Sequence, residues 1–363
     1  MRLFWELFKI SLFVIGGGYA IIAVADDVFA RRGWTKEGEL VDKLPVFQMV
    51  PGLVATHTAV YVGNKVAGAC GALVGVVAVA LPSVAVFTAV SMSYSTLPLG
   101  NSWLVAAFVG LRSALTGIIA ATLLRSLRHL ASPFAVAVFV PALCALAATE
   151  LPVWIVLLAA MAAGITAQFA SSGAGGGAHF MSPAWLGVLL FAKYGVLCFG
   201  GGFVLVPMYL QDFVGAAAPY LQLPAEEFSN LMALTQMTPG PIGVNGATYF
   251  GYRLAGVAGA LGASAALLLP GSLLAFFAFN SLERFKASRV VQGLLKGVRP
   301  ASVALMSVAL WSFAEMSVID AEGNFSFVAA ALVCLSAVAA RRKLLNPVLL
   351  IVLCAAVASV ACR

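Results

Sequence analysis

The sequence predicts an all-α integral membrane protein of about ten spans, arranged as two homologous halves of inverted topology. Three observations predict this fold class: a composition that is 62% apolar and only 10% charged, an internal duplication, and loop charges that alternate in opposite senses in the two halves. Broken or re-entrant helices are expected at two glycine triples and two Pro-Gly pairs. Inverted repeats of broken helices are typical of secondary transporters.

The composition excludes a water-soluble fold, because an ordinary soluble domain has about 25% charged residues. The apolar runs of this chain leave no room for large soluble domains and favour membrane spans. The 363 residues include 21 Lys+Arg and 14 Asp+Glu, which gives a formal charge of +7. Since the basic residues form small clusters between apolar runs, this charge indicates membrane topology, and no nucleic-acid partner is expected.

An internal duplication covers nearly the whole chain. When residues 48–73 are aligned with residues 236–261, 12 of the 26 positions are identical. A similar alignment pairs Lys9 with Lys193 and superimposes the two glycine triples. Because the second triple is internal, the first is expected to belong to a membrane helix, although the start of the chain imitates a signal peptide.

The duplication defines the expected domains. An N-terminal transporter repeat is expected at residues 1–170 and an inverted C-terminal repeat at residues 183–363. Residues 171–182 between them are a Gly-rich linker by composition. The linker also contains the pattern G-x-G-x-x-A, but a dinucleotide site would need a strand before it and a helix packed on a sheet after it, so the linker is the better interpretation.

The loop charges predict how the halves are oriented. Residues 31–43 contain four basic residues, whereas the matching connection at 211–230 has Asp and Glu but no Lys or Arg. Residues 125–129 are basic, whereas the matching 315–322 are acidic. Because Lys and Arg favour the cytoplasmic side, the halves are expected to be inverted. Inversion requires an odd number of crossings in each half, and five plus five fits the length.

The glycine triples and the Pro-Gly pairs interrupt helices inside apolar segments. Three glycines together cost about 1 kcal/mol each relative to alanine in a helix. Close helix packing, as at Gly71 and Gly75, is one explanation for such glycines. The recurrence of the triple at matching positions favours a functional break instead.

A proline that starts a half-helix leaves unpaired N–H groups and a positive dipole end, which attract an anion in a low dielectric. Two such ends, each flanked by uncharged donors, would form an anion site. Thr58 and Thr248 also lie in the following turns, and hydrogen bonding between helices is the alternative role for all these donors. The expected substrate-binding residues are Gly16, Gly17, Gly18, Gln48, Pro51, Gly52, Thr56, His57, Lys193, Gly200, Gly201, Gly202, Gln236, Pro239, Gly240 and Asn245.

Two of these residues break the symmetry between the halves. His57 stands where the other half has Asn245, so a single titratable group would lie near the site, which suggests proton coupling. A histidine bonded to a neighbouring helix is the competing interpretation. Lys193 has Leu190 where Lys9 has Glu6, so Lys193 could attract the substrate. Snorkelling of its amine to the membrane interface is the alternative.

Three stretches carry a family likeness: Gly16-Gly17-Gly18, Arg31-Arg32-Gly33-Trp34, and Gln236 to Tyr252. Together they resemble the chromate ion transporter (CHR) family in its two-domain fused form. The resemblance implies export of chromate across the bacterial or archaeal inner membrane, with sulfate as a close analogue and the proton gradient as the driving force. Some members work as pairs, so a homodimer stays open. The first half has Leu53 where the family pattern is Pro-Gly-Pro.

The expected function is therefore secondary active transport of a tetrahedral oxyanion by a multi-pass inner-membrane protein in a lipid bilayer. An anion channel and a carrier of another small anion or organic acid are the alternatives. An enzyme is not expected, because the sequence has no HExxH, G-x-S-x-G or P-loop motif. No catalytic residue, metal or cofactor is expected.

Overall fold

The computed structural model describes residues 1–13, 18–94, 101–127, 132–148, 153–168, 183–199, 202–216, 218–280, 288–319, 324–342, 344–345 and 347–361. In these ranges the chain is helical apart from short connections, with two isolated β-bridges. Four helices are long and apolar enough to cross a membrane: Val54–Ser93, Ser102–Leu124, Ile242–Asn280 and Arg289–Val318. The expected all-α membrane fold is confirmed, whereas the linker at 171–182 lies outside the described residues.

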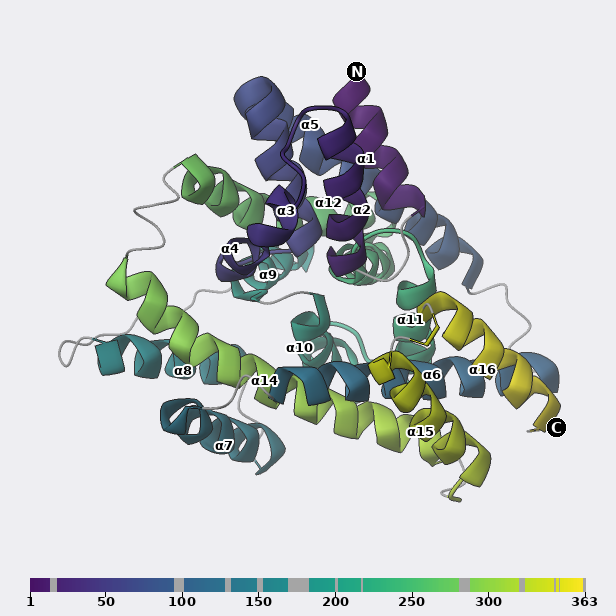
Figure 1. The fold of residues 1–363 in the computed structure, drawn as a ribbon. Helices are drawn as coiled ribbons and strands as arrows, with labels where there is room; N and C mark the ends of the chain where they lie inside the picture. Colours follow the sequence, from purple (N-terminus) through teal and green to yellow (C-terminus); the bar gives the residue numbers. More distant parts are fainter. Residues whose placement is uncertain are drawn as a thin grey trace.

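The helices of the two halves follow the same order along the chain (Figure 1). The first half contains α1 (Arg2–Phe13), α2 (Gly18–Arg31), α3 (Glu39–Asp42), α4 (Leu44–Met49), α5 (Val54–Tyr94), α6 (Ser102–Leu127), α7 (Pro133–Ala148) and α8 (Val153–Gln168). The second half contains α9 (Pro183–Leu197), the short 3₁₀ helix η1 (Gly202–Val204), α10 (Leu205–Phe213), α11 (Ala225–Met237), α12 (Ile242–Asn280), α14 (Arg289–Val318), α15 (Phe327–Arg342) and α16 (Pro347–Ala361).

The two longest helices, α5 and α12, are each folded back on themselves. In α5 the bend lies at Ala67 (φ −146°, ψ 27°) and Gly68 (φ 60°, ψ −150°). In α12 it lies at Ala255 (φ −152°, ψ 33°) and Gly256 (φ 60°, ψ −149°). A Cβ on Gly63 would lie 2.2 Å from the carbonyl oxygen of Gly71, so the arms before and after the bend pack with their backbones in contact.

The halves are interlocked rather than separate bodies. α5 packs against α12 at the centre of the molecule. The last two helices of each half cover a long helix of the other half: α7 and α8 pack on α14, while α15 and α16 pack on α6. Figure 1 shows α14 running beside α8 and α7, with α15 and α16 gathered near α6.

The bends of α5 and α12 lie at opposite ends of the second arm of α12. That arm runs from Gly256 to Asn280, which corresponds to about 36 Å at 1.5 Å per residue. At its far end Asn64 Nδ2 donates to Asn280 Oδ1 over 2.8 Å, and Asn64 lies just before the bend of α5. We call these two ends of the molecule the Asn64 end and the Gly256 end.

Candidate functional site

The segment around Pro51-Gly52 is a helical hairpin. At its base, Lys65 Nζ lies 2.7 Å from Glu39 Oε1. Near its tip, His57 Nδ1 lies 2.7 Å from the carbonyl oxygen of Phe47. The helices before and after the break therefore run antiparallel, and the chain reverses at Pro51-Gly52. We call residues 39–66 the first hairpin.

A second hairpin surrounds Pro239-Gly240 in the same way. At its base Arg253 forms an ion pair with Glu227. Near its tip Asn245 Nδ2 donates to the carbonyl oxygen of Thr235 over 3.2 Å. These four residues stand at positions that match those of Lys65, Glu39, His57 and Phe47 in the first hairpin, in the same order. We call residues 225–254 the second hairpin.

Each hairpin tip packs against the other half of the molecule. Gly52 meets Gly271 of α12, since a Cβ on Gly52 would lie 3.0 Å from the Cα of Gly271. Gly240 meets Ser83 of α5, whose Oγ donates to the carbonyl oxygen of Pro239 over 3.4 Å. Ser83 and Gly271 themselves occupy matching positions of the two halves, so the two contacts are equivalent.

Both tips require glycine. The φ angles are +123° at Gly52 and +91° at Gly240, a region that favours glycine. A Cβ would lie 2.7 Å from His57 Nε2 at the first tip and 1.7 Å from Ser83 Oγ at the second. Because conformation and space both exclude a side chain, the Pro-Gly pairs predicted from the sequence are structural requirements of the hairpins.

The N-termini of the half-helices after the two tips lie next to each other. Leu53 immediately precedes α5, and its Cδ2 would lie 3.0 Å from a Cβ on Gly243 in the first turn of α12. The Gly52 N–H donates to the carbonyl oxygen of Cys198 over 2.6 Å, and Cys198 stands two residues before the second glycine triple. A Cβ on Gly202 would lie 3.0 Å from the Gly243 nitrogen. The structure thus brings both tips and the end of this triple together.

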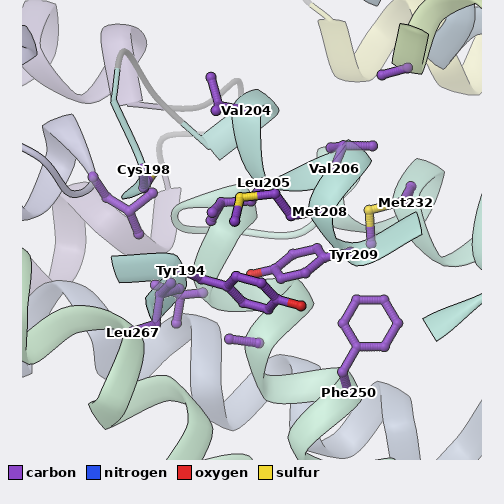
Figure 2. Packing of buried hydrophobic residues seen from close by; sticks show 14 of the residues in the cluster. Tyr194, Cys198, Val204, Leu205, Val206, Met208, Tyr209, Met232, Phe250 and Leu267 are labelled. Carbon is purple, nitrogen blue, oxygen red and sulfur yellow. The ribbon is translucent and has the colours of Figure 1, made fainter. Parts of the chain in front are cut away.

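An aromatic layer supports the second tip. The Tyr209 hydroxyl donates to the carbonyl oxygen of Gly243 over 3.0 Å. The ring centroids of Tyr194 and Tyr209 are 5.2 Å apart, and Figure 2 shows these two rings close together, with Phe250 nearby. This packing holds the first turn of α12 against α9 and α10.

His57 and Asn245 make equivalent contacts with different chemistry. The His57 ring nitrogens face the carbonyl oxygens of Phe47, at 2.7 Å, and Pro51, at 3.1 Å. Asn245 Nδ2 faces those of Thr235, at 3.2 Å, and Pro239, at 3.5 Å. The single Asn245 nitrogen has two hydrogens and serves both carbonyls without a charge. Neutral imidazole has one N–H, so only protonated His57 donates to both of its carbonyls.

The hydroxyls expected to face the site are used inside the helices. Thr56 Oγ1 donates to the carbonyl oxygen of Leu53 over 2.7 Å, and Thr58 Oγ1 to that of Val54 over 3.0 Å. Thr248 bonds Val244 and the Ser264 hydroxyl on the second arm of α12. In this structure the Thr56 hydroxyl hydrogen is bound by the carbonyl three residues before it, and a role of Thr56 in substrate binding stays a prediction.

Lys193 has a carboxylate partner, which comes from α10 and not from the Leu190 position of its own helix. Its Nζ lies 3.8 Å from Asp212 Oδ2 on α10 and 5.3 Å from the centroid of the Tyr194 ring. The Tyr194 hydroxyl donates to the same carboxylate. Asp212 therefore takes the place that Glu6 has beside Lys9, where the Nζ–Oε1 distance is also 3.8 Å.

Several expected site residues are only partly described. Gly16, Gly17, Gly200 and Gly201 lie outside the described residues, and so does the Gln48 side chain in α4. Gly18 begins α2 and Gly202 begins η1. α9 ends at Leu197, and Cys198 and Phe199 after it are not helical. Gln236 is buried in α11, three residues before Pro239.

The sequence reasoning missed the carboxylates at the hairpin bases. Glu39 Oε1 accepts hydrogen bonds from Lys65 Nζ and the Tyr61 hydroxyl, and Glu227 Oε1 accepts them from Arg253 and the Tyr249 hydroxyl. Burial raises the pKa of Glu39, but bonds from the Lys36 N–H, Lys65 and Tyr61 outweigh burial and lower the pKa to about 2. Extending the alignment of the two halves would have revealed the pair, because Glu39 and Glu227 are identical residues at matching positions.

The family profile described as chromate transporter matches residues 1–165 and 185–359. A chromate transport protein of Cupriavidus metallidurans is 25% identical, over 81% of this chain and 77% of its own length. A probable chromate transport protein of Synechococcus elongatus is 24% identical, over 97% of this chain and 93% of its own length. The uncharacterized transporter YwrA of Bacillus subtilis is 32% identical over 32% of this chain and 64% of its own length. No solved structure matches the chain.

Proposed function

Because this chain belongs to the chromate transporter family, we propose that it is a secondary active transporter of tetrahedral oxyanions, with chromate as substrate and sulfate as a close analogue. The family is one of transporters, not enzymes, and the chain is a multi-pass membrane protein. The proposed substrate site lies between the tips of the two hairpins.

The proximity of the two half-helix N-termini is the observation that supports this site. Leu53 and Gly243 are in contact where α5 and α12 begin. N–H groups without helical partners and the positive ends of two helix dipoles converge there. Such a site holds an anion through backbone donors and needs no full positive charge beside the substrate. The expected contribution of Gln236 as a donor belongs to this proposal; Asn245 contributes by holding the second tip, since both of its amide hydrogens serve tip carbonyls.

Inverted topology is the second part of the proposal. It is supported by the hairpin bases, which lie at opposite ends of the second arm of α12, a length of about 36 Å against about 30 Å for a bilayer core. Repeats at 1–170 and 183–363 joined by a linker at 171–182, with about ten spans in all, fit this arrangement. One chain supplies both hairpins, so the site itself needs no dimer.

The membrane orientation follows from the basic residues. Lys65 at the base of the first hairpin lies at the Asn64 end, and residues 31–43, four of them basic, pack there with the first hairpin. By the positive-inside rule this end faces the cytoplasm. We assign the protein to the inner membrane with efflux as its direction.

Proton coupling through His57 is the third part. Protonated His57 donates to both carbonyls that fix the first tip, whereas neutral His57 donates to one of them. Proton binding therefore favours the closed tip, and proton loss frees one of its two bonds. Asn245 holds the second tip at every pH.

Flux measurements in proteoliposomes test the proposal. Labelled chromate and sulfate are offered with and without a pH gradient, with empty liposomes as the control. We expect saturable flux that a pH gradient accelerates. Absence of saturable flux for both anions contradicts oxyanion transport. Flux that follows the anion gradient alone, without saturation or pH effect, indicates a channel.

A further inference from the structure

The base of each hairpin is closed by the same three groups. In the first hairpin, Glu39 at the start of α3 accepts hydrogen bonds from Tyr61 and Lys65, one turn apart on the first arm of α5. A second bond joins Lys65 Nζ to Glu39 Oε2 over 2.8 Å. The Lys36 N–H also donates to this oxygen, over 2.7 Å. We call the side chains of Glu39, Tyr61 and Lys65 the first clasp.

The second clasp repeats the first at the matching positions of the second half. Glu227, in the first turn of α11, accepts from the Tyr249 hydroxyl over 2.8 Å and from Arg253. Arg253 also donates to the Tyr249 hydroxyl over 2.7 Å. A carboxylate, a phenol and a cation therefore recur together in both hairpins, although lysine is replaced by arginine.

The clasps lie where they can control both arms of a hairpin. Each joins a helix that precedes the break, α3 in the first hairpin and α11 in the second, to the helix after it, at the end opposite the tip. The carboxylates are largely buried, with side chains 14% exposed for Glu39 and 20% for Glu227. Removing one partner of such a pair leaves a charge poorly compensated. The spacing of the arms, and with it the position of the tip N–H groups, depends on the carboxylate.

We infer that Glu39 and Glu227 are positioning residues for transport: each holds one hairpin closed at its base, the first at the Asn64 end and the second at the Gly256 end. This inference rests on the proposed function. The carboxylates also neutralise Lys65 and Arg253, which would otherwise attract the anion at the hairpin base. Loss of either carboxylate is expected to open one side of the molecule only.

Side-specific labelling of native Cys198 tests this inference. Cys198 is buried, and its carbonyl oxygen accepts from the first tip. Right-side-out and inside-out vesicles are treated with a membrane-impermeant maleimide, and mass spectrometry identifies the labelled cysteine. In Glu39→Gln, the labelling rate of Cys198 from the membrane face at the Asn64 end should rise about tenfold. In Glu227→Gln, the labelling rate from the opposite face should rise by the same factor. A tenfold rise corresponds to a shift of about 1.4 kcal/mol in a closed-to-open equilibrium. The exposed Glu37→Gln is the matched control.

Transport kinetics provide the second readout. Both variants should lower the maximal rate while KM for chromate stays equal or falls, because the freed cation holds the anion. The charge-swapped pair Glu39→Lys with Lys65→Glu should restore the closed state, and it also serves if Glu39→Gln does not insert. The inference is overturned if the labelling rate of Cys198 in these variants stays at the wild-type value or rises equally from both faces. It is also overturned if the charge-swapped pair does not bring the labelling rate back towards the wild-type value. If the wild-type protein carries neither anion, the proposed function fails, whereas the labelling result still decides whether the clasps close the hairpins.

Discussion

The two hairpins have the same backbone and different polar chemistry. Their helices bend at matching residues with nearly equal dihedral angles: φ is −146° at Ala67 and −152° at Ala255, and ψ is 27° and 33°. Their clasps use the same carboxylate and phenol. Near the tips, however, the first hairpin is held by a titratable ring and the second by a neutral amide.

This difference shows which contacts of the hairpins have diverged since the duplication. The bends and the clasps are needed by both halves, because each half must form the same hairpin. The tip contact need not be the same in both halves, because under the proposed proton coupling one titratable group is sufficient. The contact residues opposite the tips differ too: Gly271 faces the first tip, and Ser83 faces the second.

The largest effect is expected at the second tip. Gly240→Ala places a Cβ 1.7 Å from Ser83 Oγ and keeps a φ of +91° that disfavours alanine. We expect the initial transport rate to fall at least about a hundredfold, as for a loss of about 3 kcal/mol. Adding Ser83→Gly, which copies the contact of the first tip, should restore part of the rate. Measured flux that is equal for the single variant and the wild type would contradict the tip contact.

Converting the first tip into a copy of the second is expected to uncouple transport. In His57→Asn, the amide nitrogen can donate to both carbonyls that His57 faces, as Asn245 does in the second hairpin. We expect saturable flux of similar maximal rate that no longer responds to a pH gradient. His57→Ala removes both ring contacts with these carbonyls and serves as the comparison. If His57→Asn still accumulates anion against its gradient when a pH gradient is applied, another group carries the proton.

The stability that the Glu39 carboxylate adds to the protein is expected to depend on pH. Because the pKa of Glu39 is about 2 in the folded protein against 4.5 for a free carboxyl, its contribution is fully present above pH 4.5 and is lost as the pH falls towards 2. Glu39→Gln should lower Tm by several degrees at pH 7, and the difference should vanish near pH 2.

Thermal unfolding in detergent at several pH values measures this difference. The groups facing Glu39 are Lys65 and Tyr61 on α5; Lys43 also lies 5.1 Å from the Tyr61 ring centroid, and Asp26 on α2 accepts from backbone N–H groups of the same segment. Asp42→Asn, an exposed change in α3, is the control. A Tm difference that is the same at every pH would show that Glu39 is not ionised in the clasp.

The smallest effects are expected at the paired lysines. The Lys9 side chain is 57% exposed, and its partner Glu6 also binds Arg32, so Lys9→Gln should change stability by less than about 0.5 kcal/mol. The Lys193 side chain is 33% exposed and shares Asp212 with Tyr194. Because Asp212 neutralises its charge, we expect Lys193→Gln to raise KM about twofold. A tenfold rise in KM would assign Lys193 a direct contact with the substrate.

Much of the site followed from residues that bend or break the backbone. Pro51 and Pro239 marked both hairpins because proline fixes φ and lacks an N–H donor, and the glycine after each proline tolerates the positive φ of the reversal. The small-residue packing expected at Gly71 and Gly75 also occurs, against the first arm of α5 itself. Sequence periodicity did not reveal the sharp bend at Gly68, since both arms are apolar.

The side-chain contacts between different helices could not be predicted from local sequence patterns. The partner of Lys193 comes from α10 rather than from its own helix, and Ser83 meets a tip that belongs to the other half of the chain. Thr56 offered a donor by residue type, but its own helix turn binds that hydrogen. The partners of Lys193 and Ser83 depend on tertiary packing, which local sequence patterns do not specify, whereas the Thr56 bond is local to its own helix turn.

A structure of the protein with chromate or sulfate bound tests the central claim most directly. The account predicts tetrahedral density between the N-termini of α5 and α12, beside Leu53 and Gly243, within hydrogen-bonding distance of the backbone N–H groups there. Density for the anion at another place, with none between the two N-termini, would contradict it.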